Sequence, residues 1–324
     1  MYFNVFIGFV LLLGGAETLV RGAVALAERL GISKLVIGMT VIAFGTSMPE
    51  LIVSLNASLS GSQGLAVGNL VGSNIANILL ILGVSGLIAP IISGSGGLKR
   101  DGLILALGTC AFLIMAANGI LGLYEGLLLL IYFVGFLFYS YIREMRALSQ
   151  NKASRHEDEV DEITAIPQTL WVSILLILIG FSFLMGGSEL LIKGGVSIAR
   201  SVGVNEAVIG LTIFAVGTSL PELAASAMAA FRKHTDLALG NVVGSNIFNI
   251  IGIIGVVGIL NPLHIPSRVV NFDMWVMAAA TFMFLYFLFF NRIVVGRVRA
   301  GLYLAGYLAY ITVIAYGIDS LTPF

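Results

Sequence analysis

The segment GMTVIAFGTSMPE occupies residues 38–50, and GLTIFAVGTSLPE repeats it at residues 210–222. The two copies align without gaps at an offset of 172 residues (222 − 50). A second pair keeps the same offset, because VGNLVGSNIANI at 67–78 matches LGNVVGSNIFNI at 239–250. Such repetition at one fixed period predicts that the chain is built from two copies of one structural unit.

The composition of the 324-residue chain is typical of a polytopic membrane protein. Hydrophobic residues make up 58% of the chain and charged residues 10%, and the mean hydropathy is +1.03. Apolar runs long enough to cross a hydrocarbon core of about 30 Å recur along the whole length. We therefore expect ten spans, at about 3–28, 35–58, 65–90, 102–117, 120–142, 168–198, 207–231, 237–260, 273–290 and 299–318.

The same composition disfavours several classes of function. The net charge of zero argues against a nucleic-acid partner. Cys110 is the only cysteine and lies in an apolar run, so neither a disulfide framework nor a thiolate metal site is expected. We expect no cofactor and no enzyme activity, because the spans offer no nucleophile–base pair, paired aspartates or histidine-rich site for an intramembrane hydrolase.

The polar stretch REMRALSQNKASRHEDEVDEIT, residues 143–164, separates five predicted spans from five. We therefore divide the chain into a first repeat at 1–142, a linker at 143–167 and a second repeat at 168–324. Because each repeat holds an odd number of spans, the second copy has to enter the membrane upside down. The predicted fold is an all-α polytopic membrane protein of ten helices in two inverted five-helix repeats, as in secondary transporters.

Lysine and arginine are distributed unevenly between the predicted loops. Because cytoplasmic loops carry the excess of positive charge, we expect the linker inside and both termini outside the plasma membrane. The acidic run EDEVDE at 157–162 is either a solvated loop face or a regulatory ion-binding segment, and both interpretations stay open. The loops on the linker side hold Arg29, Lys34, Lys99, Arg100, Arg143, Arg146, Lys152, Arg155, Arg232, Lys233, Arg292, Arg297 and Arg299, whereas the opposite loops hold Arg200 and Arg268.

Glu50 and Glu222 end the two copies of the first motif. Each lies about fifteen residues into its predicted span, which at about 1.5 Å per residue places it near the middle of the membrane. An ionised carboxylate at this depth costs a few kcal/mol, so it normally faces protein, water or a cation. The alternative is that each glutamate is protonated and has a structural role. The occurrence of glutamate at equivalent positions of both copies favours a functional pair instead.

The neighbours of Glu50 favour a cation site. Ser47 lies on the same helical face as Glu50, three residues earlier. Pro49 has no N–H and Gly45 loosens the helix, so we expect a break at the midplane that exposes carbonyl oxygens around Ala43 to Thr46. Ser219, Pro221 and Gly217 repeat this arrangement in the second copy.

The second motif adds further oxygen atoms to each half. We interpret Ser73, Asn77, Ser245 and Asn249 as cation ligands. For Asn69 and Asn241, ligand and interhelical hydrogen-bonding roles both stay open, whereas Asn74 and Asn246 point elsewhere and are interpreted as packing residues. An all-oxygen set of this kind suits Ca²⁺ or Na⁺ better than Mg²⁺. Glu17 with Arg21, and Glu189 with Lys193, are predicted to form intrahelical ion pairs.

Charge suggests why this site would exchange cations. Without cations the two glutamates carry a charge of −2 in a medium of low dielectric constant, so switching between inward- and outward-facing states is costly. One Ca²⁺ or at least two Na⁺ neutralise the pair, and competition for the same glutamates then couples the two fluxes. Protons could neutralise the two glutamates in the same way. A cation channel is disfavoured, because inverted halves with broken helices favour alternating access.

The paired GTS(M/L)PE and GN(L/V)VGSNI(A/F)N motifs resemble those of the prokaryotic sodium/calcium exchangers of the Ca²⁺:cation antiporter superfamily. The resemblance covers essentially the whole chain. It implies Na⁺/Ca²⁺ antiport with Ca²⁺ and Na⁺ as substrates in a lipid bilayer and no obligatory protein partner. It also implies that the first span of each half slides to alternate access.

The resemblance further implies a ligand set. Ca²⁺ would bind Glu50, Glu222 and the carbonyl oxygens of Thr46 and Thr218. One Na⁺ would bind Ser47, Ser73 and the carbonyl of Ala215, and a second Na⁺ at the mirror site would bind Ser219, Ser245 and the carbonyl of Ala43. Asn77 and Asn249 would line the centre. Relatives often carry aspartate where this chain has Asn249, which leaves the stoichiometry and the driving ion open. Exchange of H⁺ for Ca²⁺ or another divalent cation is the alternative, although the glutamate-containing motif usual in proton-driven exchangers is absent.

Overall fold

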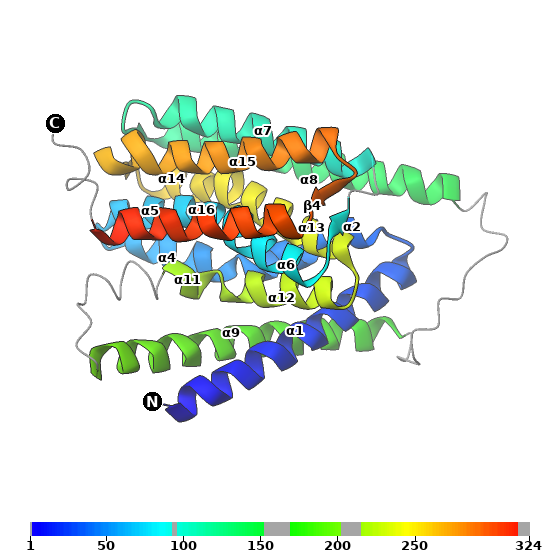
Figure 1. Ribbon diagram of the computed structural model, residues 1–324. Coiled ribbons are helices and arrows are strands. Elements are labelled where there is room, and N and C mark those ends of the chain that lie inside the picture. The colour runs from blue at the N-terminus through cyan, green and yellow to red at the C-terminus, as the bar shows by residue number, and fades with distance from the viewer. Residues whose placement is uncertain (1, 93–95, 152–168, 202–214, 317–324) are drawn as a thin grey trace.

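The computed structural model describes residues 2–92, 96–151, 169–201 and 215–316, and the chain is mostly helical over these ranges. Most of the predicted linker and the beginning of the predicted span 207–231 lie outside the described residues. Within the described ranges the helices stack in a long bundle, with the two first helices of the halves along one flank (Figure 1).

The elements of the first half follow the apolar runs of the sequence. They are α1 (Tyr2–Leu30), α2 (Lys34–Ile37), the π-helix η1 (Gly38–Ile42), α3 (Ala43–Thr46), α4 (Met48–Leu59), α5 (Gln63–Ala76), the π-helix η2 (Asn77–Ile81), α6 (Leu82–Ile88), β1 (Ile91–Ile92), α7 (Gly96–Ala116), β2 (Ile120–Leu121) and α8 (Leu123–Asn151). Three of them, α5, η2 and α6, form one continuous helical span.

The second half repeats this order with nearly the same boundaries. It contains α9 (Leu170–Ser201), α11 (Ala215–Thr218), α12 (Leu220–Phe231), α13 (Thr235–Ile247), η4 (Phe248–Ile253), α14 (Ile254–Leu260), β3 (Leu263–His264), η5 (Val269–Asp273), α15 (Met274–Phe290), β4 (Ile293–Val295) and α16 (Arg297–Tyr316). Helices α4 and α12 both have 12 residues and differ by 172 at both ends. The offset of the sequence repeat is thus also the offset of the structural elements.

Six of the described helices are long and apolar enough to cross a membrane. A seventh span results if Lys34–Thr46 and Met48–Leu59, bent by 41° at their junction, are one broken helix. Helix α12 is apolar but shorter, and α7 and α16 cover the remaining predicted spans without belonging to the six. The six are Tyr2–Leu30, Gln63–Ile88, Leu123–Glu144, Leu170–Ser201, Thr235–Leu260 and Val269–Phe290. The ten-span inverted arrangement therefore stays a prediction.

Small residues set the distance between α1 and α9, which run antiparallel (Figure 1). A Cβ atom on Gly8 would lie 2.8 Å from the carbonyl oxygen of Gly187, and one on Gly15 would lie 2.8 Å from the amide nitrogen of Leu184. Glycine is required at these points because the two backbones touch.

Gly240 and Gly244, a G-x-x-x-G pair in α13, likewise let two helices approach closely in the core. A Cβ atom on Gly244 would lie 2.5 Å from the carbonyl oxygen of Met39, so α13 packs directly on the helix that carries the first motif. A Cβ atom on Gly68 or Gly72, the equivalent glycines of the first half, would meet nothing within 4 Å among the described residues. Two short strand pairs also join the halves, since β1 pairs with β4 and β2 with β3, both antiparallel.

The α1–α9 contact gives a testable prediction. Gly15→Ala places a methyl group against the Leu184 backbone and should destabilise the fold by about 1–3 kcal/mol, the usual cost of overpacking. Gly14→Ala is the matched control, because a Cβ atom there meets nothing within 4 Å. Thermal unfolding of the purified protein in detergent measures both. Equal melting temperatures for the two variants would contradict the close contact.

Candidate cation site

Both copies of the first motif break their helix at the serine. Ser47 lies between α3 and α4 with φ −84° and ψ 6°, and Ser219 lies between α11 and α12 with φ −87° and ψ 5°. This sparsely populated bridge region between helix and strand is common at functional sites. Proline follows two residues after each break, within the first turn of α4 and α12, where its missing N–H leaves no unmade hydrogen bond.

The break differs in detail from the sequence expectation. Residues Ala43–Thr46 stay helical, and the amide of Ser47 still donates to the carbonyl of Ala43 at 3.0 Å. The interruption therefore begins at Ser47 rather than at Gly45. The role of Gly45 is steric, because a Cβ atom there would collide with the ring of Phe181 from α9.

Glu50 and Glu222 face the opposite repeat. Both side chains are buried, each at 1% exposure. The hydroxyl of Ser47 donates to Oε1 of Glu222 at 3.1 Å, and the hydroxyl of Ser219 donates to Oε1 of Glu50 at 3.4 Å. Each helix break thus supplies a hydrogen bond to the carboxylate of the other half.

Several oxygens around the two carboxylates have no hydrogen-bond donor. Among the described residues, no partner is present for the buried Oε2 atoms of Glu50 and Glu222, for Oγ of Ser245, for Oδ1 of Asn249 or for either polar atom of the Asn77 side chain. Burying ionised oxygen without a partner is costly, so such groups normally meet a positive charge. Unpartnered carboxylate, hydroxyl and amide oxygens are the ligands that Ca²⁺ and Na⁺ prefer.

The site contains two carboxylates rather than more. Among the described residues, no cluster of three or more His, Cys, Asp or Glu side chains could hold a metal ion. Among the described residues, the further candidate ligands beside Glu50 and Glu222 are therefore neutral oxygens.

The two halves differ at the second motif. Nδ2 of Asn249 donates to Oγ of Ser73 at 3.1 Å, and Ser73 in turn donates to the carbonyl of Leu70 at 3.0 Å. Their mirror residues, Asn77 and Ser245, are equally buried, but their side chains have no hydrogen-bond partner among the described residues. Of the two pairs that span the repeats, Asn249–Ser73 is thus hydrogen-bonded and Asn77–Ser245 is not.

The sequence-predicted residues are placed as follows. Hydrogen bonds link Ser47 to Glu222, Ser219 to Glu50 and Ser73 to Asn249. The side chain of Ala215, the first residue of α11, lies outside what the structure describes. The remaining predicted residues, Ala43, Thr46, Asn77, Thr218 and Ser245, are all buried.

Two serines near the site were not singled out from the sequence. Ser54 and Ser226 are fully buried and accept hydrogen bonds from Asn69 and Asn241. The signal that would have identified them is the repeat itself, because they match at the same offset of 172 residues (226 − 54) in otherwise apolar helices.

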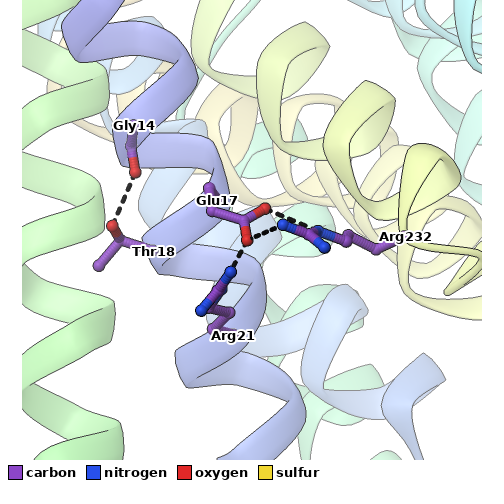
Figure 2. Close-up of polar contacts among 5 residues, drawn as sticks. All are labelled: Gly14, Glu17, Thr18, Arg21 and Arg232. Atoms are coloured by element: carbon purple, nitrogen blue, oxygen red, sulfur yellow. Dashed lines mark hydrogen bonds and ion pairs between the residues drawn. The ribbon is translucent and has the colours of Figure 1, made fainter. Parts of the chain in front are cut away.

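A separate network of charged side chains surrounds Glu17 on α1 (Figure 2). Arg21 donates to Glu17 at 2.5 Å, and Lys193 lies 2.5 Å from Glu189, so both predicted intrahelical pairs form. Glu17 also pairs with Arg232, which directly follows α12, through two hydrogen bonds. The position equivalent to Arg232 in the first half is Ser60, which carries no charge. Glu17 is accordingly less exposed (21%) than Glu189 (65%).

Comparison with known proteins gives one consistent result. The family described as "Sodium/calcium exchanger protein" matches residues 2–142 and 172–316. The chain is 38% identical over 278 residues to the "Putative antiporter CaxA" of Alkalimonas amylolytica, covering 86% of each protein. It is 33% identical to the "Sodium/calcium exchanger MaX1" of Methanosarcina acetivorans, over 87% of this chain and 89% of that protein. A solved structure of the sodium-calcium exchanger NCX_Mj, soaked with Na⁺ and Ca²⁺, aligns with a TM-score of 0.81 and 32% identity over 95% and 96% of the two chains.

The charge network predicts unequal effects in the two halves. Glu17→Gln removes the partner of two arginines and should lower stability by about 1 kcal/mol, whereas Glu189→Gln removes one exposed pair and should change it by less than about 0.5 kcal/mol. Thermal unfolding at low salt measures both variants, and high salt should reduce the difference. A larger loss for Glu189→Gln than for Glu17→Gln would contradict the role of Arg232.

Proposed function

Because the chain belongs to the sodium/calcium exchanger protein family, we propose that it exchanges Na⁺ for Ca²⁺ across the membrane by alternating access. The chain is a multi-pass membrane protein and a cation antiporter, not an enzyme. The observation that carries the proposal is the reciprocal pair of buried carboxylates, each bonded to the serine of the other half and each with one oxygen free.

The charge of this pair supplies the coupling. Two ionised carboxylates are costly to bury unless cations compensate them. One Ca²⁺ or two Na⁺ balance the charge equally well, so either cargo permits the change of access and the carboxylate pair without cations resists it. Binding of one cation then excludes the other from the shared oxygens, which makes the two fluxes obligatorily opposed.

The proposed ligand set follows the repeats. Supporting it are the burial of the described side chains and the free oxygens of Glu50, Glu222, Ser245 and Asn249. In this proposal Ca²⁺ binds Glu50, Glu222 and the carbonyls of Thr46 and Thr218. One Na⁺ site consists of Ser47, Ser73 and the carbonyl of Ala215, and the other of Ser219, Ser245 and the carbonyl of Ala43. Asn77 and Asn249 line the centre.

The proposed topology has ten spans in two inverted repeats, residues 1–142 and 168–324, joined by a cytoplasmic linker at 143–167. Both termini face outside the plasma membrane. The recurrence of element boundaries at one offset supports two equivalent repeats. The reciprocal contacts between the halves are those expected of a two-fold relation.

Transport in proteoliposomes tests the function. Vesicles loaded with Na⁺ and diluted into Na⁺-free buffer containing ⁴⁵Ca²⁺ should accumulate Ca²⁺ in wild-type but not in protein-free vesicles. Uptake should be absent when K⁺ replaces the internal Na⁺. Uptake driven by an imposed pH gradient, and not by Na⁺, would contradict Na⁺ exchange and establish the H⁺/Ca²⁺ alternative.

Removing either carboxylate charge should abolish exchange. Glu50→Gln and Glu222→Gln keep the side-chain shape but remove half of the site's charge. We expect the rate of Na⁺-driven uptake to fall by about 100-fold or more, equivalent to about 3 kcal/mol, the usual cost of breaking a buried charge pair. Glu189→Gln, an exposed glutamate outside the site, is the control. Wild-type exchange by either site variant would overturn the site assignment.

A further inference from the structure

We propose that Asn69 and Asn241 are positioning residues, each of which fixes the helix break of one repeat against the glutamate-bearing helix of the other. The inference rests on the proposed function, because it concerns how that site is held in shape. It resolves the two roles that the sequence leaves open for these asparagines.

Asn241 connects three segments. Its Oδ1 accepts a hydrogen bond from the hydroxyl of Thr46 at 3.3 Å, at the end of α3 in the first repeat. Its Nδ2 donates to Oγ of Ser226 at 2.8 Å and to the carbonyl of Glu222 at 3.4 Å, both in α12 of the second repeat. The side chain is 1% exposed. Its amide is therefore engaged on both ends by protein groups.

Asn69 makes the mirror connection. Its Oδ1 accepts from the hydroxyl of Thr218 at 3.3 Å, and its Nδ2 donates to Oγ of Ser54 at 3.1 Å. Ser54 is itself anchored to the carbonyl of Ala66 at 3.3 Å. The bonds to threonine and serine thus occur twice with the same atoms, whereas the bond to a glutamate carbonyl is found at Asn241 and, among the described residues, not at Asn69. Asn69 is half-buried, whereas Asn241 is buried.

The tether determines which acceptor the hydroxyl of Thr46 donates its hydrogen bond to. The hydroxyl of Thr46 has two acceptors within reach, Oδ1 of Asn241 at 3.3 Å and the carbonyl of Ala43 at 3.5 Å. The Ala43 carbonyl already accepts the amide of Ser47 at 3.0 Å, and a carbonyl oxygen has two lone pairs. When Thr46 donates to Asn241, the second lone pair of Ala43 stays available for a cation.

The tether also fixes the neighbouring ligands. Thr46 and Ser47 are adjacent, and Ser47 bonds to Glu222. Asn241 holds Thr46 and the backbone of Glu222 at the same time, so it sets the distance between the broken helix and the carboxylate. Without Asn241 the two repeats remain packed, but the oxygens of the site lose their fixed spacing. Affinity for the cation falls more than the rate of conformational change.

Asn74 and Asn246 provide matched controls in the same helices. Both are fully buried. Each donates to a carbonyl four residues earlier in its own helix, Asn74 to Leu70 at 2.6 Å and Asn246 to Val242 at 2.8 Å. Each shares its residue type and its helix with one of the two tether asparagines, and Asn246 also shares the burial of Asn241, but the hydrogen bonds of both control side chains stay within one helix.

The test measures the Ca²⁺ dependence of Na⁺-driven ⁴⁵Ca²⁺ uptake in proteoliposomes. Thr46→Val removes the hydroxyl that reaches Asn241 and should raise the KM for Ca²⁺ about tenfold, as expected for one buried hydrogen bond. Asn241→Leu removes all three hydrogen bonds of the amide and should raise the KM at least as much. The maximal rate should stay within about threefold. Thr46→Ser keeps the hydroxyl and should retain the wild-type KM.

A double-mutant cycle separates the tether from general packing. Because Asn241→Leu already removes the bond to Thr46, Asn241→Leu combined with Thr46→Val should be no worse than Asn241→Leu alone. Multiplicative effects, an unchanged KM in both single variants, or an equal rise of KM in Asn246→Leu would overturn the inference. If Asn241→Leu does not fold, the comparison of Thr46→Val with Thr46→Ser decides, and equal KM values for these two would overturn it.

Calorimetric titration of the detergent-purified proteins with CaCl₂ distinguishes this failure from that of the proposed function. Weaker Ca²⁺ binding by Asn241→Leu than by Asn246→Leu supports the tether even if Na⁺ drives no uptake. Wild-type transport with equal affinities for all variants overturns the tether alone. A wild-type protein that neither transports nor binds Ca²⁺ overturns both.

Discussion

Two buried carboxylates that each accept a hydrogen bond from the other half are the constraint on which the rest of this structure depends. Glu50 and Glu222 lie where water cannot reach them, so their charge has to be met by protein dipoles and by cations. Helix breaks at Ser47 and Ser219 turn each serine across the interface between the repeats, which a continuous helix would not do. The close approach of α13 to the first broken helix, made possible by Gly244, brings the breaks together. A membrane protein tolerates such irregular backbone only where other protein encloses it, and here each repeat encloses the break of the other.

The two halves have the same design but are not in the same state. Asn249 is bonded to Ser73, while Asn77 and Ser245 have free polar atoms. Glu17 has Arg232 of the second half as a second partner, whereas the position equivalent to Arg232 in the first half is the uncharged Ser60. Asn241 is enclosed and Asn69 is half-buried. Inverted repeats that make unequal contacts are compatible with the proposed alternating access, in which the two repeats exchange conformations.

The repeat was the most informative feature of the sequence, because it showed that each polar residue of the motifs has an equivalent in the other half. Periodicity and proline placement predicted the helix break, and the offset predicted which serines, asparagines and glutamates belong together. Contacts between distant segments were beyond such reasoning. The role of Gly45 depends on a ring from α9, and that of Glu17 on an arginine 215 residues away. The partners of Asn69 and Asn241 could not be read from spacing along one helix either, because both asparagines reach across the interface between the repeats. Local rules predict which side chains share a helical face, whereas packing decides what that face meets.

The amides at the centre of the site limit the charge that it can balance. Among the described residues, the candidate site has two carboxylates, Glu50 and Glu222, whereas the side chains of Asn77 and Asn249 are neutral amides. If the proposed exchange is correct, one Ca²⁺ and two Na⁺ are the cargoes that leave no net charge in the buried site. A third Na⁺ would leave one positive charge without a carboxylate, at the desolvation cost that the glutamate pair otherwise offsets.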